Sequence, residues 1–191
     1  MGKITFNERA FIADFQRIMG TALREAGMTA MSIMIKNIMS LPAHDFKGDF
    51  KTEVASKINM ALEQETDTCM KLLVGLIDDQ SDEWFMTRAK ILEYGMGSLA
   101  DPAGGGDLEP VSHVQGVAGI NDTVTGYAPV SNKPTYLLPD SWNHPPGHWF
   151  EDSVTMCREI FEEYIERAWE QINLGDYIKI EGKWTLNWTF M

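Results

Sequence analysis

The sequence predicts an α+β protein: a long N-terminal helix and a C-terminal helix packed on a small, mostly antiparallel sheet, with a long Pro/Gly-rich loop and a C-terminal β-hairpin. Three observations support this prediction. Two of them are periodicities: apolar residues recur at helical spacing near both ends of the chain, and they alternate with polar residues in short runs elsewhere. The third is composition, since residues 95–147 hold seven of the eight prolines and nine of the sixteen glycines.

Residues 5–40 predict one long helix, because apolar side chains recur at steps of three or four residues. Gly20 and Gly27 lie within this stretch, and each costs about 1 kcal/mol relative to alanine, so the helix can bend there. Pro42 ends the pattern. A polar turn is expected over residues 44–51.

Two strands and a short helix are predicted next. Apolar and polar residues alternate over 58–62, which predicts a half-buried strand followed by a turn over 63–67. The mostly apolar run 69–77 predicts a better buried strand. A short helix is expected from Ser81, as its N-cap, to Gly95.

Glu93 lies two residues before Gly95, among apolar neighbours. We therefore expect its carboxyl group to be partly buried and to bond the backbone or a nearby basic residue, with Arg88 and Lys90 closest in sequence. A carboxylic acid of raised pKa is the alternative, but no second carboxylate is placed to work with it.

Residues 95–147 are expected to form an arm that projects from the body, because prolines exclude the segment from a helix interior or a central sheet. Within the arm, the glycines at 104–106 predict a hinge. Short edge strands are expected at Thr123–Val130 and Thr135–Leu138.

The last helix is expected from about Trp149 to Leu174, with Gly175 as its stop. It has an apolar stripe and acidic other faces. We treat residues 1–191 as one domain, with the arm inserted in it and residues 176–191 as a hairpin extension.

The hairpin extension ends in four large apolar side chains that share one face of its second strand. Burying each of them stabilises by about 1.5–3 kcal/mol. Docking within the chain and addition to a neighbour's sheet are the two alternatives. Together with three aromatic residues of the arm, these side chains form the predicted interface set: Tyr127, Tyr136, Trp142, Trp184, Leu186, Trp188 and Phe190.

The formal net charge of −12 argues against a protein that wraps nucleic acid, which requires Lys and Arg. Solubility is the simple explanation, and the wall of a passage through which DNA slides is the alternative. No apolar run reaches the length of a bilayer span, and no signal peptide is expected. Cys69 and Cys157 are expected to be reduced.

No constellation of residues predicts catalysis. A G-x-S-x-G elbow and a phosphate loop are missing from the sequence. His144 and His148 have the spacing of zinc ligands on a helix, but Pro145 and Pro146 lie between them, so no metal site is predicted. We expect no catalytic residue, no cofactor and no metal.

Short motifs follow one another in a characteristic order. These are Leu41-Pro42, Val74-Gly75, the segment Ala89–Gly95 with its Glu-Tyr-Gly end, and Pro146–Phe150 opening the last helix. Their order resembles the tail-completion or head–tail joining (neck, minor tail) proteins of long-tailed bacteriophages. The resemblance covers residues 5–174. The chain departs from the family in its longer loop and its Trp-rich hairpin, and it has Met96 where the family commonly has Thr.

The resemblance implies a structural virion protein, made in the host cytoplasm, which forms a ring at the neck or upper tail end. Its partners would be copies of itself in a hexamer or dodecamer, and other neck, connector and tail-tube proteins. DNA would pass nearby without specific binding, and no membrane is involved. The alternatives are a soluble acidic protein-binding module, of host-interaction or DNA-mimic type, and a small hydrolase that uses a histidine of the arm.

Overall fold

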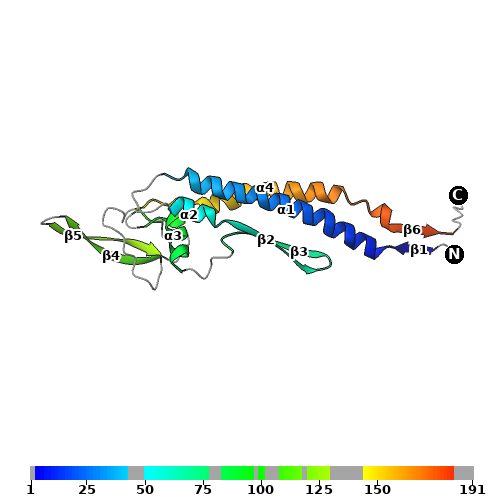
Figure 1. The fold of residues 1–191 in the computed structure, drawn as a ribbon, viewed down its shortest axis with the longest axis horizontal. Helices are drawn as coiled ribbons and strands as arrows, with labels where there is room; N and C mark the ends of the chain where they lie inside the picture. Colours follow the sequence, from blue (N-terminus) through cyan, green and yellow to red (C-terminus); the bar gives the residue numbers. More distant parts are fainter. Residues whose placement is uncertain are drawn as a thin grey trace, which may run out of the picture. The chain divides into compact units, whose positions relative to one another are not determined.

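The structure is a computed structural model, and it describes residues 3–42, 50–77, 83–96, 99–101, 108–117, 120–129 and 144–182 (Figure 1). It confirms the α+β class. The elements in chain order are β1 (Lys3–Phe6), α1 (Glu8–Ser40), α2 (Phe50–Ser56), β2 (Asn59–Thr66), β3 (Cys69–Gly75), α3 (Glu83–Tyr94), β4 (Leu108–Val117), β5 (Ile120–Pro129), α4 (Trp149–Glu170), a 3₁₀-helix (Leu174–Tyr177) and β6 (Ile178–Glu181).

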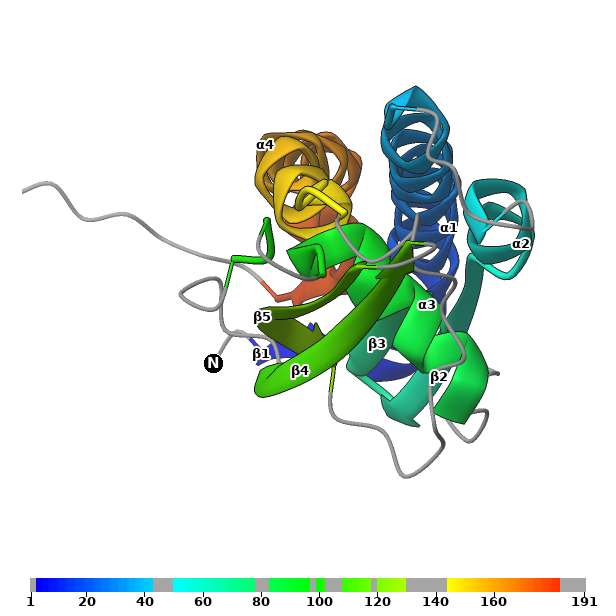
Figure 2. The same ribbon diagram turned by 90° about the vertical axis from the view of Figure 1, so that its left-hand side faces the viewer.

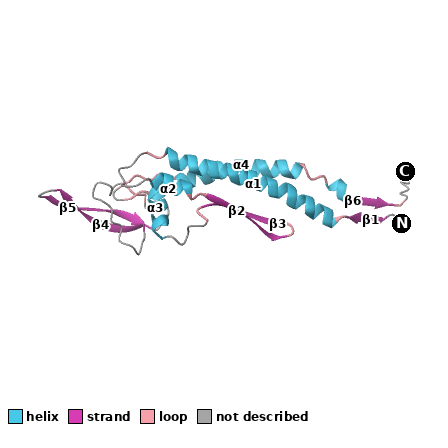
Figure 3. Ribbon diagram, viewed as in Figure 1, coloured by secondary structure: helices cyan, strands magenta, loops and turns pink. Residues whose placement is uncertain are grey.

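The strands pair two by two, as β1–β6, β2–β3 and β4–β5, and not as a single sheet (Figure 3). The predicted start of the first helix at Thr5 was wrong, because residues 3–6 are extended and pair with β6. The helix begins at Glu8, after Asn7, whose side-chain oxygen accepts the Ala10 N–H.

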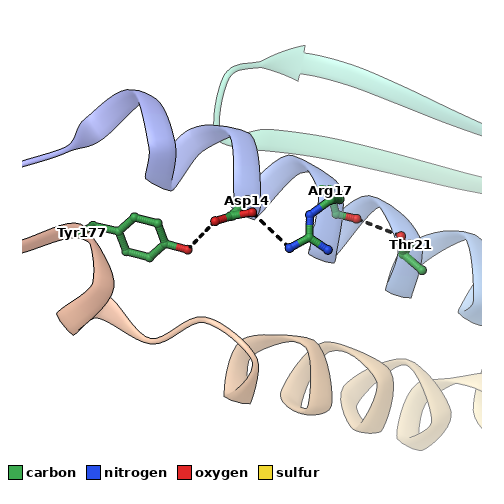
Figure 4. Close-up of polar contacts among 4 residues, drawn as sticks. All are labelled: Asp14, Arg17, Thr21 and Tyr177. Atoms are coloured by element: carbon green, nitrogen blue, oxygen red, sulfur yellow. Dashed lines mark hydrogen bonds and ion pairs between the residues drawn. The ribbon is translucent and has the colours of Figure 1, made fainter.

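The chain divides into two compact units. The first comprises residues 1–26, 62–72 and 160–191. Its core residues come from the N-terminal part of α1, the C-terminal part of α4, the 3₁₀-helix and the link between the last two: Ile18, Ala22, Ala168, Ile172 and Tyr177. The Tyr177 ring lies edge-on to Phe11 at 5.4 Å, and its hydroxyl donates to the Asp14 carboxylate (Figure 4).

The second unit comprises residues 27–61 and 73–159. Its core gathers side chains from α1, α2, the link after α2, α3 and the start of α4: Met34, Ile38, Val54, Ala55, Ile58, Ala89, Leu92 and Trp149. Helix α2 was not predicted. It begins at Phe50, within the polar turn expected over 44–51. Residues 43–49 of that expected turn lie outside the described residues. Only two residues of this seven-residue helix, Val54 and Ala55, belong to the core, and two neighbouring apolar residues do not establish a helical period.

The hairpin β2–β3 turns later than predicted. Strand β2 continues through Thr66, where a turn over 63–67 was expected, and the turn is Asp67–Thr68. Strand β2 is hydrogen-bonded to β3, and the Gln16 side chain donates to the Asp67 carbonyl at 3.0 Å.

The last helix ends earlier than predicted, at Glu170 and not at Leu174. Asn173 breaks the helical course, because its side-chain oxygen accepts the Gly175 N–H at 3.1 Å and starts the 3₁₀-helix. Gly175 is therefore inside that turn and is not the helix stop. The strand expected at Ile178–Ile180 is confirmed as β6, but its partner is β1; residues 183–191 lie outside the described residues.

The arm contains a long antiparallel hairpin, whose ten register pairs run from Leu108↔Pro129 to Val117↔Ile120. The predicted strand at Thr123–Val130 falls almost wholly within β5. Strand β4 was not predicted, and Pro110 within it explains why. The expected strand at 135–138 and the glycines at 104–106 lie outside the described residues. Strand β5 contacts α3, and Figure 2 shows these two elements side by side.

Candidate functional site: the root of the arm

The two ends of the arm meet in the second unit, where Glu93–Met96 lies against His144–Phe150; we call this junction the arm root. Met96 and His144 exchange both backbone hydrogen bonds, at 2.8 and 3.0 Å, as an antiparallel pair does. The Gly147 N–H donates to the carbonyls of Leu92 and Glu93, both at 3.1 Å. These bonds close the polypeptide into a loop with a fixed base.

Two glycines permit this approach. Gly95 has φ +75°, and a Cβ there would lie 2.5 Å from the His144 carbonyl oxygen and 2.8 Å from the Pro146 nitrogen. A Cβ at Gly147 would lie 2.5 Å from the Leu92 carbonyl oxygen. Because the obstructing atoms belong to the backbone, no side-chain rotation relieves the overlap, and any other residue would separate the two segments.

Glu93 joins α3 to the start of α4. Its carboxylate accepts the Phe150 N–H at 2.7 Å and the Glu151 N–H at 3.2 Å, two of the amide groups that a helix N-terminus leaves without intrahelical partners. Burial raises the pKa of Glu93, and the two backbone hydrogen bonds oppose that rise. The expected burial and backbone bonding of Glu93 are confirmed; Arg88 instead pairs with Glu53.

His148 is the residue before α4, and its carbonyl accepts the Asp152 N–H at 2.9 Å. Its φ is +49°, which is uncommon for a residue with a side chain. The ring faces two carboxylates, with Nδ1 3.7 Å from Glu151 Oε2 and Nε2 4.0 Å from Asp101 Oδ2. The imidazole thus lies beside acidic groups on both sides.

The ligand atoms of Glu93, His148 and Glu151 lie within 4.8 Å of one another, which is close enough to consider a divalent cation. Two features of the root disfavour one. Both oxygens of Glu93 already accept backbone N–H groups, and the N-terminal end of α4 is the positive end of its dipole. The arrangement is that of a helix cap, and we assign no metal to it.

An apolar hollow of ≈ 390 Å³ adjoins the root within the second unit. It lies between the end of β3, the inner face of α3 and the first turn of α4. Its lining comprises Leu73, Val74, Gly75, Leu76, Ile77, Met86, Ala89, Lys90, Glu93, Tyr94, Trp149 and Phe150. Trp149 is buried, whereas the neighbouring Phe150 is exposed.

Of the predicted interface residues, Tyr127 belongs to β5, opposite Pro110 of β4. The other six, Tyr136, Trp142, Trp184, Leu186, Trp188 and Phe190, lie outside the described residues. Sequence reasoning missed one apolar surface, on β1, although the alternation Lys3-Ile4-Thr5-Phe6 is a strand signal that could have shown it.

No known family, curated protein or solved structure matches the chain. Among the helices in the described part of the chain, none combines the length and the apolar character that crossing a bilayer requires.

Proposed function

We propose that this chain is a structural virion protein of a tailed bacteriophage, which forms a ring at the head–tail neck or upper tail end and joins the tail to the capsid connector. The observation that carries the proposal is the arm: a hairpin of ten register pairs inserted between two segments that bond to each other at its base. Such an element suits contact between proteins better than chemistry.

A two-stranded hairpin is marginally stable by itself in water. Each strand of this hairpin pairs with only the other within the described chain, so each has a further edge of N–H and C=O groups. Strand edges of this kind are recruited by neighbouring proteins through β-augmentation. We infer that the hairpin is completed in an assembled ring, where it reaches a neighbouring subunit or an adjoining neck protein.

The charge of the chain fits a protein that lines a DNA passage. The net charge is −12, and α4 carries a row of exposed acidic residues: Glu151, Asp152, Glu159, Glu162, Glu163, Glu166 and Glu170. Acidic walls repel the phosphate backbone, so DNA passes without adhering. We assign no catalytic activity to the chain in this proposal.

The test is removal of the hairpin without disturbing its base. Leu108 and Pro129 are directly opposed, and opposed Cα atoms are about 4.5–5.5 Å apart, so a short turn can replace residues 109–128. The test uses a phage in which the gene for this chain is disrupted. Wild-type chain supplied from a second copy of the gene should restore particles with heads joined to tails. The excision variant should leave heads and tails separate in electron micrographs.

The excision variant must first show the circular dichroism and cooperative unfolding of a folded protein, so that loss of joining reports the hairpin. Infectious particles from a folded excision variant would refute the role of the arm. Purified particles with no copy of the chain near the capsid–tail junction would refute the virion function itself.

The acidic face of α4 also favours a second candidate, a soluble acidic protein-binding module of host-interaction or DNA-mimic type. That candidate predicts a chain absent from purified particles, which binds DNA-processing proteins and is displaced from them by salt or by DNA. The location of the chain in particles therefore discriminates between the two.

A further inference from the structure

A hollow of ≈ 280 Å³ lies within the first unit, between the N-terminal part of α1 and the C-terminal part of α4. Three of its lining residues, Ile18, Ala22 and Ala168, are apolar and buried. The two alanines belong to different helices, and side chains this small leave space that larger residues would fill. The rest of the lining is polar: Arg17, Thr21, Glu25, Tyr164, Arg167 and Gln171.

The side of the hollow that α1 provides is organised around Arg17. Its Nη2 donates to Asp14 Oδ1 at 3.0 Å, about one turn earlier on the helix, and the Thr21 hydroxyl donates to the Arg17 carbonyl at 2.8 Å (Figure 4). The Asp14 carboxylate also accepts the Tyr177 hydroxyl at 3.0 Å. Asp14 does not belong to the lining, so it holds the arginine from outside the hollow.

The side that α4 provides repeats this arrangement around Arg167. Its Nη2 donates to Glu163 Oε1, about one turn earlier, and the Gln171 side-chain amide donates to the Arg167 carbonyl at 3.2 Å. Glu163 is likewise not part of the lining. The Gln171 amide has two N–H groups, and one of them suffices for this bond. The hollow therefore has a guanidinium on each side, and a carboxylate outside the lining holds each one.

The two arginines keep donors for a ligand. A guanidinium carries five N–H donors, and among the described residues Arg17 and Arg167 each direct one nitrogen, Nη2, to a carboxylate. The other donors can form the paired bonds with which arginine recognises phosphate or carboxylate oxygens. The lining has these two arginines against one acidic residue, Glu25, in a chain of net charge −12. Two cations favour an anion of two charges over an anion of one.

We propose that this hollow binds a phosphate group, either as inorganic phosphate or as the phosphoryl end of a small molecule. The inference stands apart from the virion proposal, because it concerns a ligand of the purified chain. The phosphate oxygens accept from Arg17 and Arg167, and the second N–H of the Gln171 amide is a further donor. The volume is close to the lower limit of small-molecule sites, about 300 Å³, so the ligand has few atoms beyond the phosphate.

A nucleic acid would supply the same phosphate chemistry, but the surroundings oppose it. An extended polyanion would meet Asp14 and Glu163 beside the two arginines, and exposed Glu162 and Glu166 on α4. A single phosphate occupies the hollow without this repulsion. The side chains of Arg17 and Arg167 are 69% and 64% exposed, so water and salt compete with the ligand, and we expect a Kd of about 0.1–1 mM.

The experiment titrates three anions into the wild-type chain at low ionic strength and measures each Kd by NMR. Inorganic phosphate tests the free ion, glycerol 3-phosphate tests a phosphorylated small molecule, and acetate tests an anion of single charge. The first two should bind, whereas acetate should bind at least about tenfold more weakly. The side-chain Nε–H signals of Arg17 and Arg167 should shift in parallel with binding, which locates the ligand without any variant. The tighter of the two phosphate compounds shows which source the hollow prefers.

Two matched pairs of variants separate the hollow from general charge. Arg17→Gln is compared with Arg24→Gln on α1, and Arg167→Gln with Arg158→Gln on α4. Arg24 and Arg158 are exposed and lie outside the lining, and each of the four substitutions removes one positive charge. Each hollow variant should bind phosphate at least about tenfold more weakly, and each control should change the Kd by less than about twofold. Because all four side chains are exposed, the variants should fold, which circular dichroism checks.

Four results would overturn the proposal. The first is a wild type that binds neither phosphate compound at about 10 mM. The second is an equal loss of binding in a hollow variant and its control, or signal shifts spread equally over all four arginines, which would show an adventitious ion only. The third is acetate binding as tight as phosphate binding. The fourth is a single-stranded oligonucleotide that binds through Arg17 and Arg167 more tightly than either phosphate compound.

Discussion

The carboxylate of Glu93 accepts the backbone N–H of Phe150 at 2.7 Å, across 57 positions of sequence that include the whole arm. One side chain at the end of α3 thereby caps α4 and fixes the place from which the arm leaves the body. The root depends on this contact, on two glycines and on one buried indole, and each of these is open to measurement.

Replacing Glu93 with alanine should destabilise the second unit by about 1–2 kcal/mol, because two amide groups at the start of α4 lose their acceptor. Urea denaturation followed by circular dichroism measures the change. Glu159→Ala, at an exposed position of α4, is the matched control and should change the free energy of unfolding by less than about 0.5 kcal/mol. Equal effects of the two substitutions would show that Glu93 is not a cap.

The pH dependence of this contact follows from the raised pKa of Glu93. A carboxyl group whose pKa is higher in the folded state binds its proton more tightly there, so its contribution is full below its ordinary value of 4.5 and is lost as pH rises through the folded pKa. The free energy of unfolding of the wild type, minus that of Glu93→Gln, should therefore fall as pH rises from about 4.5. A difference that is flat or rises over this range would contradict burial as the dominant influence.

Gly95→Ala should destabilise by about 3 kcal/mol or more, because it adds a backbone overlap to the cost of a positive φ. Gly75→Ala separates the two effects, since Gly75 has φ +139° with nothing within 4 Å of a Cβ, and it should cost about 1–3 kcal/mol. Gly20→Ala, within α1, should stabilise by about 0.5–1 kcal/mol, because the added Cβ would lie in ordinary contact with Met70 Sδ, at 3.6 Å. Thermal and urea unfolding of the three variants give the order, and a Gly95 variant no worse than the Gly75 variant would disprove the close approach.

Trp149→Ala should cost about 3–5 kcal/mol, since the indole is buried in the core of the second unit and donates to the Ala89 carbonyl at 3.4 Å. Trp169→Ala is the matched control, because that side chain is half exposed and has an edge-on ring contact with Phe15. Its cost should be less than half as large. Urea midpoints at constant m-value test the comparison, and comparable losses would show that Trp149 is not a core residue.

Tyr177→Phe should raise the pKa of Asp14. The hydrogen bond from Arg17 and, as the second largest influence, the hydrogen bond from Tyr177 lower this pKa below its ordinary value of 3.8 (Figure 4). A lowered pKa gives stability that is present above the unfolded value and is lost as pH falls, so the variant should lose less stability than the wild type on acidification. Carbon-detected NMR titration of the Asp14 carboxyl measures the shift. An unchanged titration would show that the tyrosine hydroxyl does not reach Asp14 in solution.

Several elements were predictable because their signal is local. The helical period of α1 and α4 fixed their type and approximate length, and the apolar neighbours of Glu93 indicated its burial. The end of α4 was predicted four residues too late, because the side chain of Asn173 competes for the backbone there. Helix α2 was not predicted, because its seven residues are too few to show a helical period.

Local sequence patterns were enough to predict the fold class, the two long helices, the position of the arm and the apolar alternation of β6. The pairing of β6 with β1, and the meeting of the two ends of the arm at Gly95 and Gly147, could be recognised only in the folded chain. The physical reason is that a period of two assigns side chains to faces, while any strand edge offers the same N–H and C=O groups. The choice of partner depends on contacts between residues far apart in the chain, which no local pattern records.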